Sequence, residues 1–220
     1  MDLTKMSDLQ DYIKKGTTTV GIVCKEGVVL AADKRATAAG RIVLNKDVQK
    51  VFKLTDDLAV TIAGNVSDIQ LITKLVKAEI ELKTIRTNRK PSVKEVANLL
   101  GSIIYQNIRR FSAIPGVTAF LLAGRDMEGI HFYELSPDGS IMKHDKYMAD
   151  GSGFMYALGV LDTLYKKDMS LPEGITLAVQ AINAAIQRDA ATGEGIDVLT
   201  VTKEGVKVVL AKRLNTTITA

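Results

Sequence analysis

Residues 17–33, TTTVGIVCKEGVVLAAD, contain two runs of β-branched and small apolar residues separated by Lys25-Glu26-Gly27. Such residues favour strands, and charged residues followed by glycine are typical of a turn. The stretch therefore predicts a β-hairpin with strands at Thr17–Cys24 and Val28–Asp33. A hairpin at this point favours a fold built on antiparallel sheet, and the rest of the chain is consistent with that expectation.

The residues before the hairpin, MDLTKMSDLQDYIKKG at 1–16, have a different pattern. Their apolar residues recur every three or four positions among charged ones, which predicts a short amphipathic helix or a mobile leader that ends at Gly16. They contain no apolar run of about 7–15 residues, so a secretory signal is not expected. We expect 1–16 to be a leader and 17–220 to be one domain.

After the hairpin the sequence alternates between strand-like and helix-like segments. The expected strands are Arg41–Leu44, Val51–Leu54, Leu58–Ala63, Val117–Ala123, Ile130–Leu135, Ser140–Lys143, Asp197–Thr202 and Val206–Ala211, and the expected helices are Val66–Arg86, 92–111, Phe154–Lys166 and Leu171–Asp189. Short connections between strands favour antiparallel pairing, and helices that come in pairs argue against a doubly wound parallel sheet. We therefore expect an α+β fold, a four-layer αββα sandwich of two largely antiparallel sheets flanked by helix pairs.

Composition excludes several classes of function. The 220 residues include one cysteine and two histidines, so an internal disulfide is excluded and most zinc sites lack enough ligands. The net charge of +4 is spread along the chain, unlike the clustered basic patch of a nucleic-acid binder. The longest uncharged stretches, Phe111–Gly124 and Gly174–Gln187, have 14 residues each, whereas a membrane-spanning helix needs roughly 17–25. We expect a cytoplasmic protein with no membrane or nucleic-acid partner and no cofactor.

The glycine-rich segment Gly151-Ser152-Gly153 precedes an expected helix. It lacks the lysine of a P-loop, the third glycine of a dinucleotide-binding motif and the Gly-x-Ser-x-Gly pattern of a nucleophile elbow. On local sequence alone Ser152 is best interpreted as the N-cap of that helix. The remaining candidate groups have equally simple interpretations: Cys24 as a small buried residue, and His131 and His144 as structural or surface residues.

The bond between Gly16 and Thr17 is a candidate cleavage site, because its cleavage would activate Thr17 as a nucleophile. Cleavage there would give Thr17 a free α-amine with a pKa of about 8. Such an amine acts as general base toward the hydroxyl of its own residue. Glycine before the bond places no Cβ in the path of the attacking hydroxyl. Taken alone, the junction is more typical of a disordered tail ahead of a strand.

Several motifs, beginning with the one at Thr17, support a functional role for this junction. In order along the chain they are Thr17-Thr18-Thr19-Val20-Gly21-Ile22, Ala31-Ala32-Asp33-Lys34-Arg35, Lys50-Val51-Phe52, Thr61-Ile62-Ala63-Gly64, Gly151-Ser152-Gly153, and Arg188-Asp189 followed by Gly195-Ile196-Asp197. As a set they resemble the catalytic β subunit of the proteasome core particle, of the archaeal type. The resemblance extends from Thr17 to about Lys212. It implies the αββα fold of the N-terminal nucleophile hydrolases and a self-processing threonine endopeptidase.

The resemblance also implies a role for each matched residue. These are Thr17 as nucleophile and base, Asp33 and Lys50 as an ion pair beside it, the Gly64 N–H as oxyanion donor, Ser152 and Asp189 as partners of the terminal amine, and Thr192 as possible support in a position where the family commonly has serine. The positive charge of Lys50 would lower the pKa of the amine. By simple spacing Gln49 would stand in place of Lys50, but the Lys-Val-Phe motif and the need for a charge favour Lys50.

A substrate pocket and partners follow from the same resemblance. Ala36, Val48, Ile62 and Val66 would form pocket walls that are uncharged, which predicts cleavage after large apolar residues. The expected partners are other β subunits in a seven-membered ring, a ring of α subunits, protein substrates and, indirectly, an ATP-dependent unfoldase. Two alternatives remain at this point: another N-terminal nucleophile amidohydrolase, and a non-catalytic ring subunit of the same fold.

Overall fold

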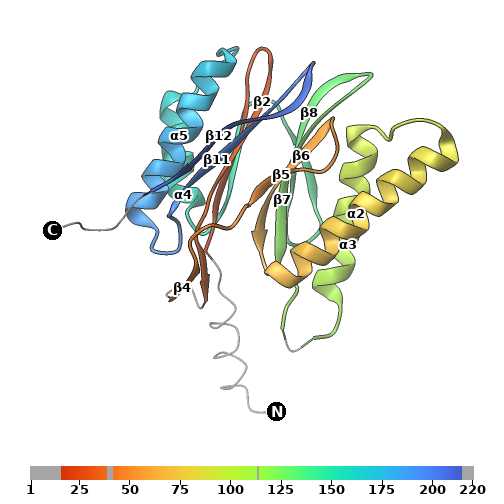
Figure 1. The fold of residues 1–220 in the computed structure, drawn as a ribbon, viewed down its shortest axis with the longest axis horizontal. Helices are drawn as coiled ribbons and strands as arrows, with labels where there is room; N and C mark the ends of the chain where they lie inside the picture. The colour runs from red at the N-terminus through yellow and green to blue at the C-terminus, as the bar shows by residue number, and fades with distance from the viewer. Residues whose placement is uncertain (1–15, 39–41, 113, 215–220) are drawn as a thin grey trace.

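The protein was analysed as a computed structural model that describes residues 16–38, 42–112 and 114–214. Two sheets of five strands each lie face to face in these residues, and a helix pair covers the outer face of each sheet (Figure 1). This arrangement confirms the expected αββα sandwich. The expected leader, apart from Gly16, and Arg41 at the start of one expected strand lie outside the described residues.

The first sheet has the strand order β10-β1-β2-β11-β12 and is antiparallel throughout. Its strands are β1 (Thr18–Val23), β2 (Gly27–Asp33), β10 (Tyr147–Gly151), β11 (Gly195–Thr202) and β12 (Gly205–Arg213). The predicted hairpin is confirmed, with Val20 opposite Ala31. Because β1 and β2 are flanked by β10 and β11, the hairpin lies in the middle of the sheet, and both ends of β1 are fixed on two sides.

The second sheet has the order β5-β6-β7-β8-β9, again antiparallel. Its strands are β5 (Val51–Lys53), β6 (Leu58–Gly64), β7 (Thr118–Asp126), β8 (Gly129–Leu135) and β9 (Ile141–His144). A separate two-stranded sheet pairs β3 (Ala36–Ala38) with β4 (Ile42–Asn45). This small sheet continues from the end of β2 and leads the chain across to the start of β5.

The four expected helices are all present within the described residues: α2 (Val66–Thr87), α3 (Val93–Arg109), α4 (Phe154–Leu164) and α5 (Leu171–Arg188). The helices α3 and α5 begin with capping boxes, in which Ser92 pairs with Glu95 and Ser170 pairs with Glu173. This arrangement satisfies N–H groups that would otherwise lack partners in the first turn. Helices α2 and α3 lie on the second sheet and α4 and α5 on the first (Figure 1).

Apolar side chains fill three layers of core. One layer, which includes Leu30, Leu121 and Phe132, lies between the sheets, and the others lie beneath the two helix pairs. Complete burial of such side chains contributes about 1.5–3 kcal/mol each. The sandwich is therefore held along its length by apolar contacts, and charged side chains that are buried at its ends need specific partners.

Two short strands were not expected from the sequence. One is β3, which has three residues, and the other is β10, whose residues Tyr147–Gly151 include the polar Asp150. Both are formed through pairing: β3 with β4, which follows it closely along the chain, and β10 with β1, which is far from it in sequence. The pairing of β10 with β1 places Gly151 opposite Thr18. This register brings Ser152 next to the start of β1.

Candidate active site

Polar side chains gather at the end of the sandwich where β1 begins. Thr17 precedes β1 and is only 6% exposed. Its hydroxyl donates a hydrogen bond to the carbonyl oxygen of Gly16 over 2.6 Å, and the ammonium of Lys50 donates to the same oxygen over 3.1 Å. A hydroxyl and a cation therefore lie at the carbonyl of the one bond whose cleavage was expected.

Lys50 owes its position to Asp33. The Lys50 Nζ lies 2.7 Å from Asp33 Oδ1, and both side chains are almost fully buried. Asp33 accepts three further hydrogen bonds, from the backbone N–H groups of Thr18, Arg35 and Gly193, each over 3.0 Å. Buried charges are costly unless they are paired and hydrogen-bonded. These contacts meet that requirement and fix the lysine beside Gly16. Gln49, by contrast, is exposed.

The pKa of Lys50 is lowered from its usual value. Burial is the main cause, the charge of Arg35 adds to it, and the carboxylate of Asp33 opposes it. A cation in this position also disfavours a second positive charge nearby. The nitrogen of Thr17, once released as an amine, would lie in this field and would be shifted toward its neutral, basic form.

Ser152, Asp189 and Thr192 form a chain of hydrogen bonds that ends at Thr17. The Thr17 N–H donates to Ser152 Oγ over 3.2 Å, and Ser152 Oγ donates to Asp189 Oδ2 over 2.5 Å. Thr192 Oγ1 lies 2.6 Å from the same carboxylate oxygen and 2.7 Å from Thr18 Oγ1. The interpretation of Ser152 as a helix N-cap is wrong, because α4 is capped by Gly153 without a side-chain bond. The strand β10 directs Ser152 toward Thr17 instead.

Gly64 ends β6 with a φ of +118°, a conformation that side chains rarely adopt. A Cβ at this position would lie 2.2 Å from the carbonyl oxygen of Val117. Two residues earlier, the N–H of Ile62 donates to the carbonyl of Lys50 over 2.9 Å. Alternate N–H groups of a strand share one edge, so that of Gly64 lies on the edge that faces the Lys50 segment. Its place agrees with the expected donor to an oxyanion.

The four expected pocket residues lie on different segments of the chain. Ala36 begins β3, Ile62 belongs to β6 and Val66 opens α2, directly after the turn that follows Gly64. Val48 lies in the segment before Lys50, where its N–H donates to the carbonyl of Lys34 over 3.0 Å. All four are at least partly exposed. Their apolar side chains are thus accessible, and their role as the walls of a substrate pocket stays a prediction.

Several contributors were not identified from the sequence. Thr37 on β3 accepts a hydrogen bond from the N–H of Gly16 over 3.0 Å, so it aligns the chain on the other side of the candidate bond. Arg35 and the segment Gly193-Glu194-Gly195 adjoin the site through Asp33 and Asp189. A glutamate between two glycines after Arg188-Asp189 is the sequence signal that could have indicated a tight, specialised loop.

Comparison with known proteins gives this geometry a family. The family model described as proteasome subunit matches residues 13–201. The chain belongs to the proteasome subunit family. Its relatives include the proteasome subunit beta of Ferroglobus placidus, which is 41% identical over 196 residues, or 89% of this chain and 91% of that protein. The proteasome subunit beta 1 of Thermococcus onnurineus is 47% identical over 191 residues (87% and 91%), and the proteasome subunit beta 2 of Pyrococcus abyssi is 44% identical over 200 residues (91% and 93%).

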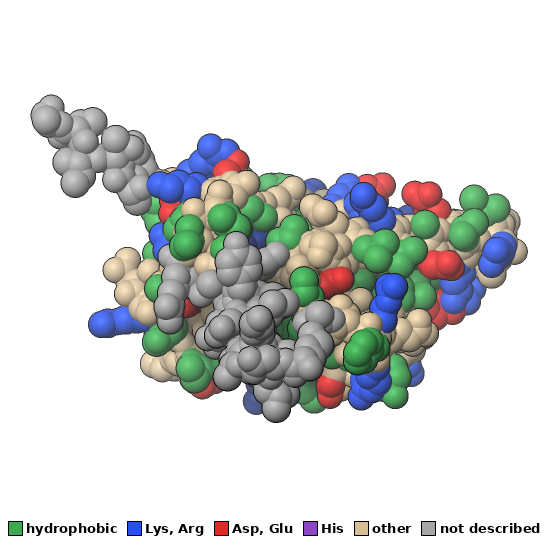
Figure 2. Space-filling view, turned by 90° about the horizontal axis from the view of Figure 1, so that it is seen from below, with side chains coloured by type: hydrophobic (Ala, Val, Ile, Leu, Met, Phe, Trp, Pro, Cys, Tyr) green, Lys and Arg blue, Asp and Glu red, His purple; other side chains and the backbone are tan. Residues whose placement is uncertain are grey.

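Membership in the proteasome family confirms the resemblance and the fold indicated by the motifs, and it makes this chain a proteasome-type peptidase subunit of a core particle. No described helix is both long and apolar enough to cross a membrane. On the described part of the face seen from below, basic side chains are interspersed with acidic and apolar ones (Figure 2). That surface differs from the clustered basic patch of a nucleic-acid-binding protein.

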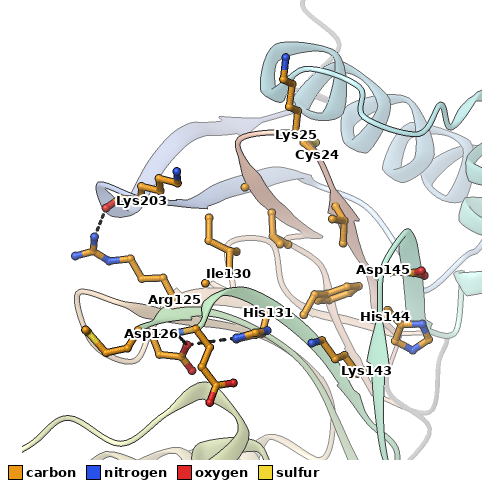
Figure 3. Close-up of a pocket in the computed structure, with 17 residues that line it drawn as sticks. Cys24, Lys25, Arg125, Asp126, Ile130, His131, Lys143, His144, Asp145 and Lys203 are labelled. Atoms are coloured by element: carbon orange, nitrogen blue, oxygen red, sulfur yellow. Dashed lines mark hydrogen bonds and ion pairs between the residues drawn. The ribbon is translucent and has the colours of Figure 1, made fainter.

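The proteasome subunit has a second candidate region at the opposite end of β1. A cavity of about 630 Å³ opens there between the β1–β2 and β7–β8 turns (Figure 3). Its His131 Nε2 points toward Asp126 Oδ1 at 3.3 Å, and burial raises the pKa of Cys24 to about 12. The thiol is therefore protonated at neutral pH and is not a nucleophile. The expected burial of Cys24 is confirmed, and the histidines each lie against a carboxylate, His131 at Asp126 and His144 at Glu134.

Proposed function

We propose that this proteasome subunit is a threonine endopeptidase that acts in the cytoplasm and releases its own residues 1–16 at the Gly16–Thr17 bond. The observation that carries the proposal is the convergence of the Thr17 hydroxyl and the Lys50 ammonium on the Gly16 carbonyl oxygen, at 2.6 and 3.1 Å. A hydroxyl attacks a carbonyl more readily when a cation stabilises the charge that develops on the oxygen.

In the proposed self-cleavage, Thr17 Oγ1 bonds to the carbonyl carbon of Gly16. The bond from that carbon to the Thr17 nitrogen then breaks, and the hydroxyl proton passes to the nitrogen, which leaves an ester and a free amine. Water hydrolyses the ester and frees the carboxylate of Gly16. The hydrogen bond from the Gly16 N–H to Thr37 Oγ1, 3.0 Å long, holds Gly16 in place for the attack.

In the proposed peptidase, the amine of Thr17 takes the proton from Oγ1 as the hydroxyl attacks a substrate carbonyl. The nitrogen lies 3.2 Å from Ser152 Oγ, which Asp189 orients in turn. Lys50 keeps the amine in its neutral form, and the Gly64 N–H donates to the oxyanion. Thr192 supports Asp189. This division of roles gives the peptidase a nucleophile, a base, groups that orient the base and a donor to the oxyanion.

The substrates in this proposal are unfolded polypeptides, and cleavage follows large apolar residues. The support for it is that Ala36, Val48, Ile62 and Val66, which the family resemblance assigns to the pocket, are apolar and at least partly exposed. Peptides with Leu, Phe or Tyr at the cleavage position should give kcat/KM values about 10- to 200-fold above those with Arg or Glu. A fluorogenic peptide series measures this ratio, and equal turnover of the Arg and Glu peptides would contradict the preference.

The proposed assembly is a seven-membered ring of β subunits stacked on a ring of α subunits, with substrates delivered by an ATP-dependent unfoldase. Family membership supports assembly with other proteasome subunits. Enclosure has a physical reason, since an open site that cleaves after apolar residues would digest any unfolded chain. Electron microscopy of the assembled particle would count the subunits, and a six-membered ring would contradict this part of the proposal.

A pair of substitutions tests the catalytic role. Core particles that contain Thr17→Ala should lose peptide hydrolysis by at least about 10³-fold, since the nucleophile is absent. Thr17→Ser keeps a hydroxyl and an amine and should remain active. Hydrolysis by the Thr17→Ala particle at the wild-type rate would refute the proposal. Equal inactivity of wild-type and Thr17→Ala particles would favour the alternative of a non-catalytic ring subunit.

A further inference from the structure

The loop from Asp189 to Gly195 joins α5 to β11 and touches the proposed catalytic groups at several points. Asp189 accepts from Ser152, Thr192 contacts Thr18, and the Gly193 N–H donates to Asp33 Oδ2 over 3.0 Å. A displacement of this loop would therefore move the carboxylate that holds Lys50 as well as the one that orients Ser152.

Arg35 spans this loop from one side. Its Nη1 donates to the carbonyl of Ala190 over 2.8 Å, and its Nη2 donates to Glu194 Oε1 over 3.1 Å. The Glu194 side chain is only 7% exposed. Gly193 lies flat against the guanidinium, because a Cβ there would come within 2.6 Å of Arg35 Cζ. The loop is thus held at its beginning and near its end by one planar group, which suits a fork-shaped donor.

Glu194 occupies a backbone conformation that does not favour it. Its φ is +66°, in the left-handed region that glycine adopts without cost. It stands between Gly193 and Gly195, so a third glycine would suit the backbone better. A glutamate in this conformation indicates that its side chain makes a stabilising contact that offsets the backbone strain. Its ion pair with Arg35 is the contact that the structure shows for that side chain.

We propose that the Arg35–Glu194 ion pair is a positioning device for the proteolytic site, which clamps the 189–195 loop and thereby fixes Asp33 and Asp189. This inference rests on the proposed function, since it assigns these residues to the machinery around Thr17. Arg35 and Glu194 are positioning residues, because their side chains bond to the loop and to each other rather than to Thr17 or Gly16. The effect should appear in kcat more than in KM.

The test uses assembled core particles with Arg35→Gln, Arg35→Lys, Glu194→Gly and wild-type sequence. Arg35→Gln and Glu194→Gly should lower kcat by roughly 10- to 100-fold, as expected for misplaced catalytic groups, with KM changed less than about 2-fold. Glu194→Gly should not lower the unfolding temperature, because it relieves the backbone. Arg35→Lys keeps the charge but loses the fork, so it should recover only part of kcat.

Arg125 provides a matched control at the far end of the sandwich. It too joins a carboxylate to a backbone carbonyl, with Nε on Asp57 Oδ1 at 2.6 Å and Nη1 on the carbonyl of Lys203. Arg125→Gln should leave kcat unchanged. If both Arg35→Gln and Glu194→Gly keep wild-type kcat while Thr17→Ala is inactive, the clamp is refuted and the proposed function stands. If Thr17→Ala is active, the proposed function itself fails.

Discussion

The two ends of the sandwich contain similar residue types but arrange them differently. At the Thr17 end, the one lysine in the cluster, Lys50, is buried and bonded to Asp33 and to the Gly16 carbonyl. At the other end, Lys25, Lys143 and Lys203 line the cavity of Figure 3, are exposed, and form no ion pair with another described residue. The ends lie on the order of 20 Å apart, the length of β1 at about 3.3 Å per residue.

The difference shows that a cavity alone does not identify a reactive site. The far cavity has a volume of about 630 Å³, yet its thiol is protonated and three of its lysines, Lys25, Lys143 and Lys203, are exposed. At the Thr17 end, the buried Lys50 ammonium, which is paired with Asp33, and the Thr17 hydroxyl meet at one carbonyl oxygen. An electrostatic interaction is stronger where the groups that form it are shielded from water and point at the same atom. Substitutions of one lysine and one glycine at each end, and of Cys24 at the far end, test this contrast.

The largest effect is expected from the lysines. Lys50→Met keeps the apolar stem and removes the charge, so peptide hydrolysis and release of the leader should both fall by at least about 10³-fold. Asp33 keeps three backbone N–H donors, so the fold should persist. Lys143→Met at the far end should change kcat/KM by less than about 2-fold. Peptide kinetics with circular dichroism measures both, and equal losses in the two variants would break the contrast.

Two glycines with similar backbone angles give the next largest effect. Gly64 has a φ of +118° and Gly129 one of +133°, but a Cβ would meet Val117 only at Gly64 and nothing within 4 Å at Gly129. Both alanine variants should lose about 1–3 kcal/mol of stability from backbone strain. Only Gly64→Ala should also lose about 10²–10³-fold in kcat, through displacement of the oxyanion donor. An active Gly64→Ala particle would remove Gly64 from the mechanism.

The smallest effect on activity is expected at Cys24. Burial raises its pKa from 9.0 to about 12, so alkylation by iodoacetamide should speed up with pH until about pH 12. Because burial favours the protonated thiol in the folded protein, Cys24 makes its full contribution to the free energy of unfolding below pH 9.0. That contribution is lost as the pH rises toward about 12. Cys24→Ala should leave hydrolysis unchanged. In a Cys24→Ala/Lys25→Cys control the exposed thiol should react fast at pH 9, and equally fast reaction of Cys24 would contradict its burial.

Much of the fold was predictable because local patterns carry it. Runs of β-branched and small apolar residues around a turn at Lys25-Glu26-Gly27 identified β1 and β2, and helical spacing of apolar residues after Ser92 identified α3. The strands β3 and β10 could not be predicted in the same way. Three residues are too few to show a period, and β10 is a strand because β1 lies beside it. Strand propensity depends on such neighbours, which no local window contains.

The site was predictable to a similar extent. The motifs named Thr17, Asp33 and Lys50. In the structure Lys50 bonds directly to Asp33, and both the Lys50 ammonium and the Thr17 hydroxyl bond to the Gly16 carbonyl oxygen. Ser152 was ambiguous, because a serine before a helix is usually a cap, and only the register of β10 against β1 directs it to Thr17. Arg35 and Glu194 gave no local signal of their ion pair, since they are 159 positions apart.

The central claim is that the buried cluster cleaves the bond next to Thr17. Intact-mass spectrometry of this chain after assembly with its partner subunits tests the claim most directly, with Thr17→Ala as the control. The wild-type chain should begin at Thr17 and contain residues 17–220, whereas the Thr17→Ala chain should keep all 220 residues. A wild-type chain that keeps residues 1–16 in an assembled particle, or a Thr17→Ala chain that loses them at the same bond, would contradict the account.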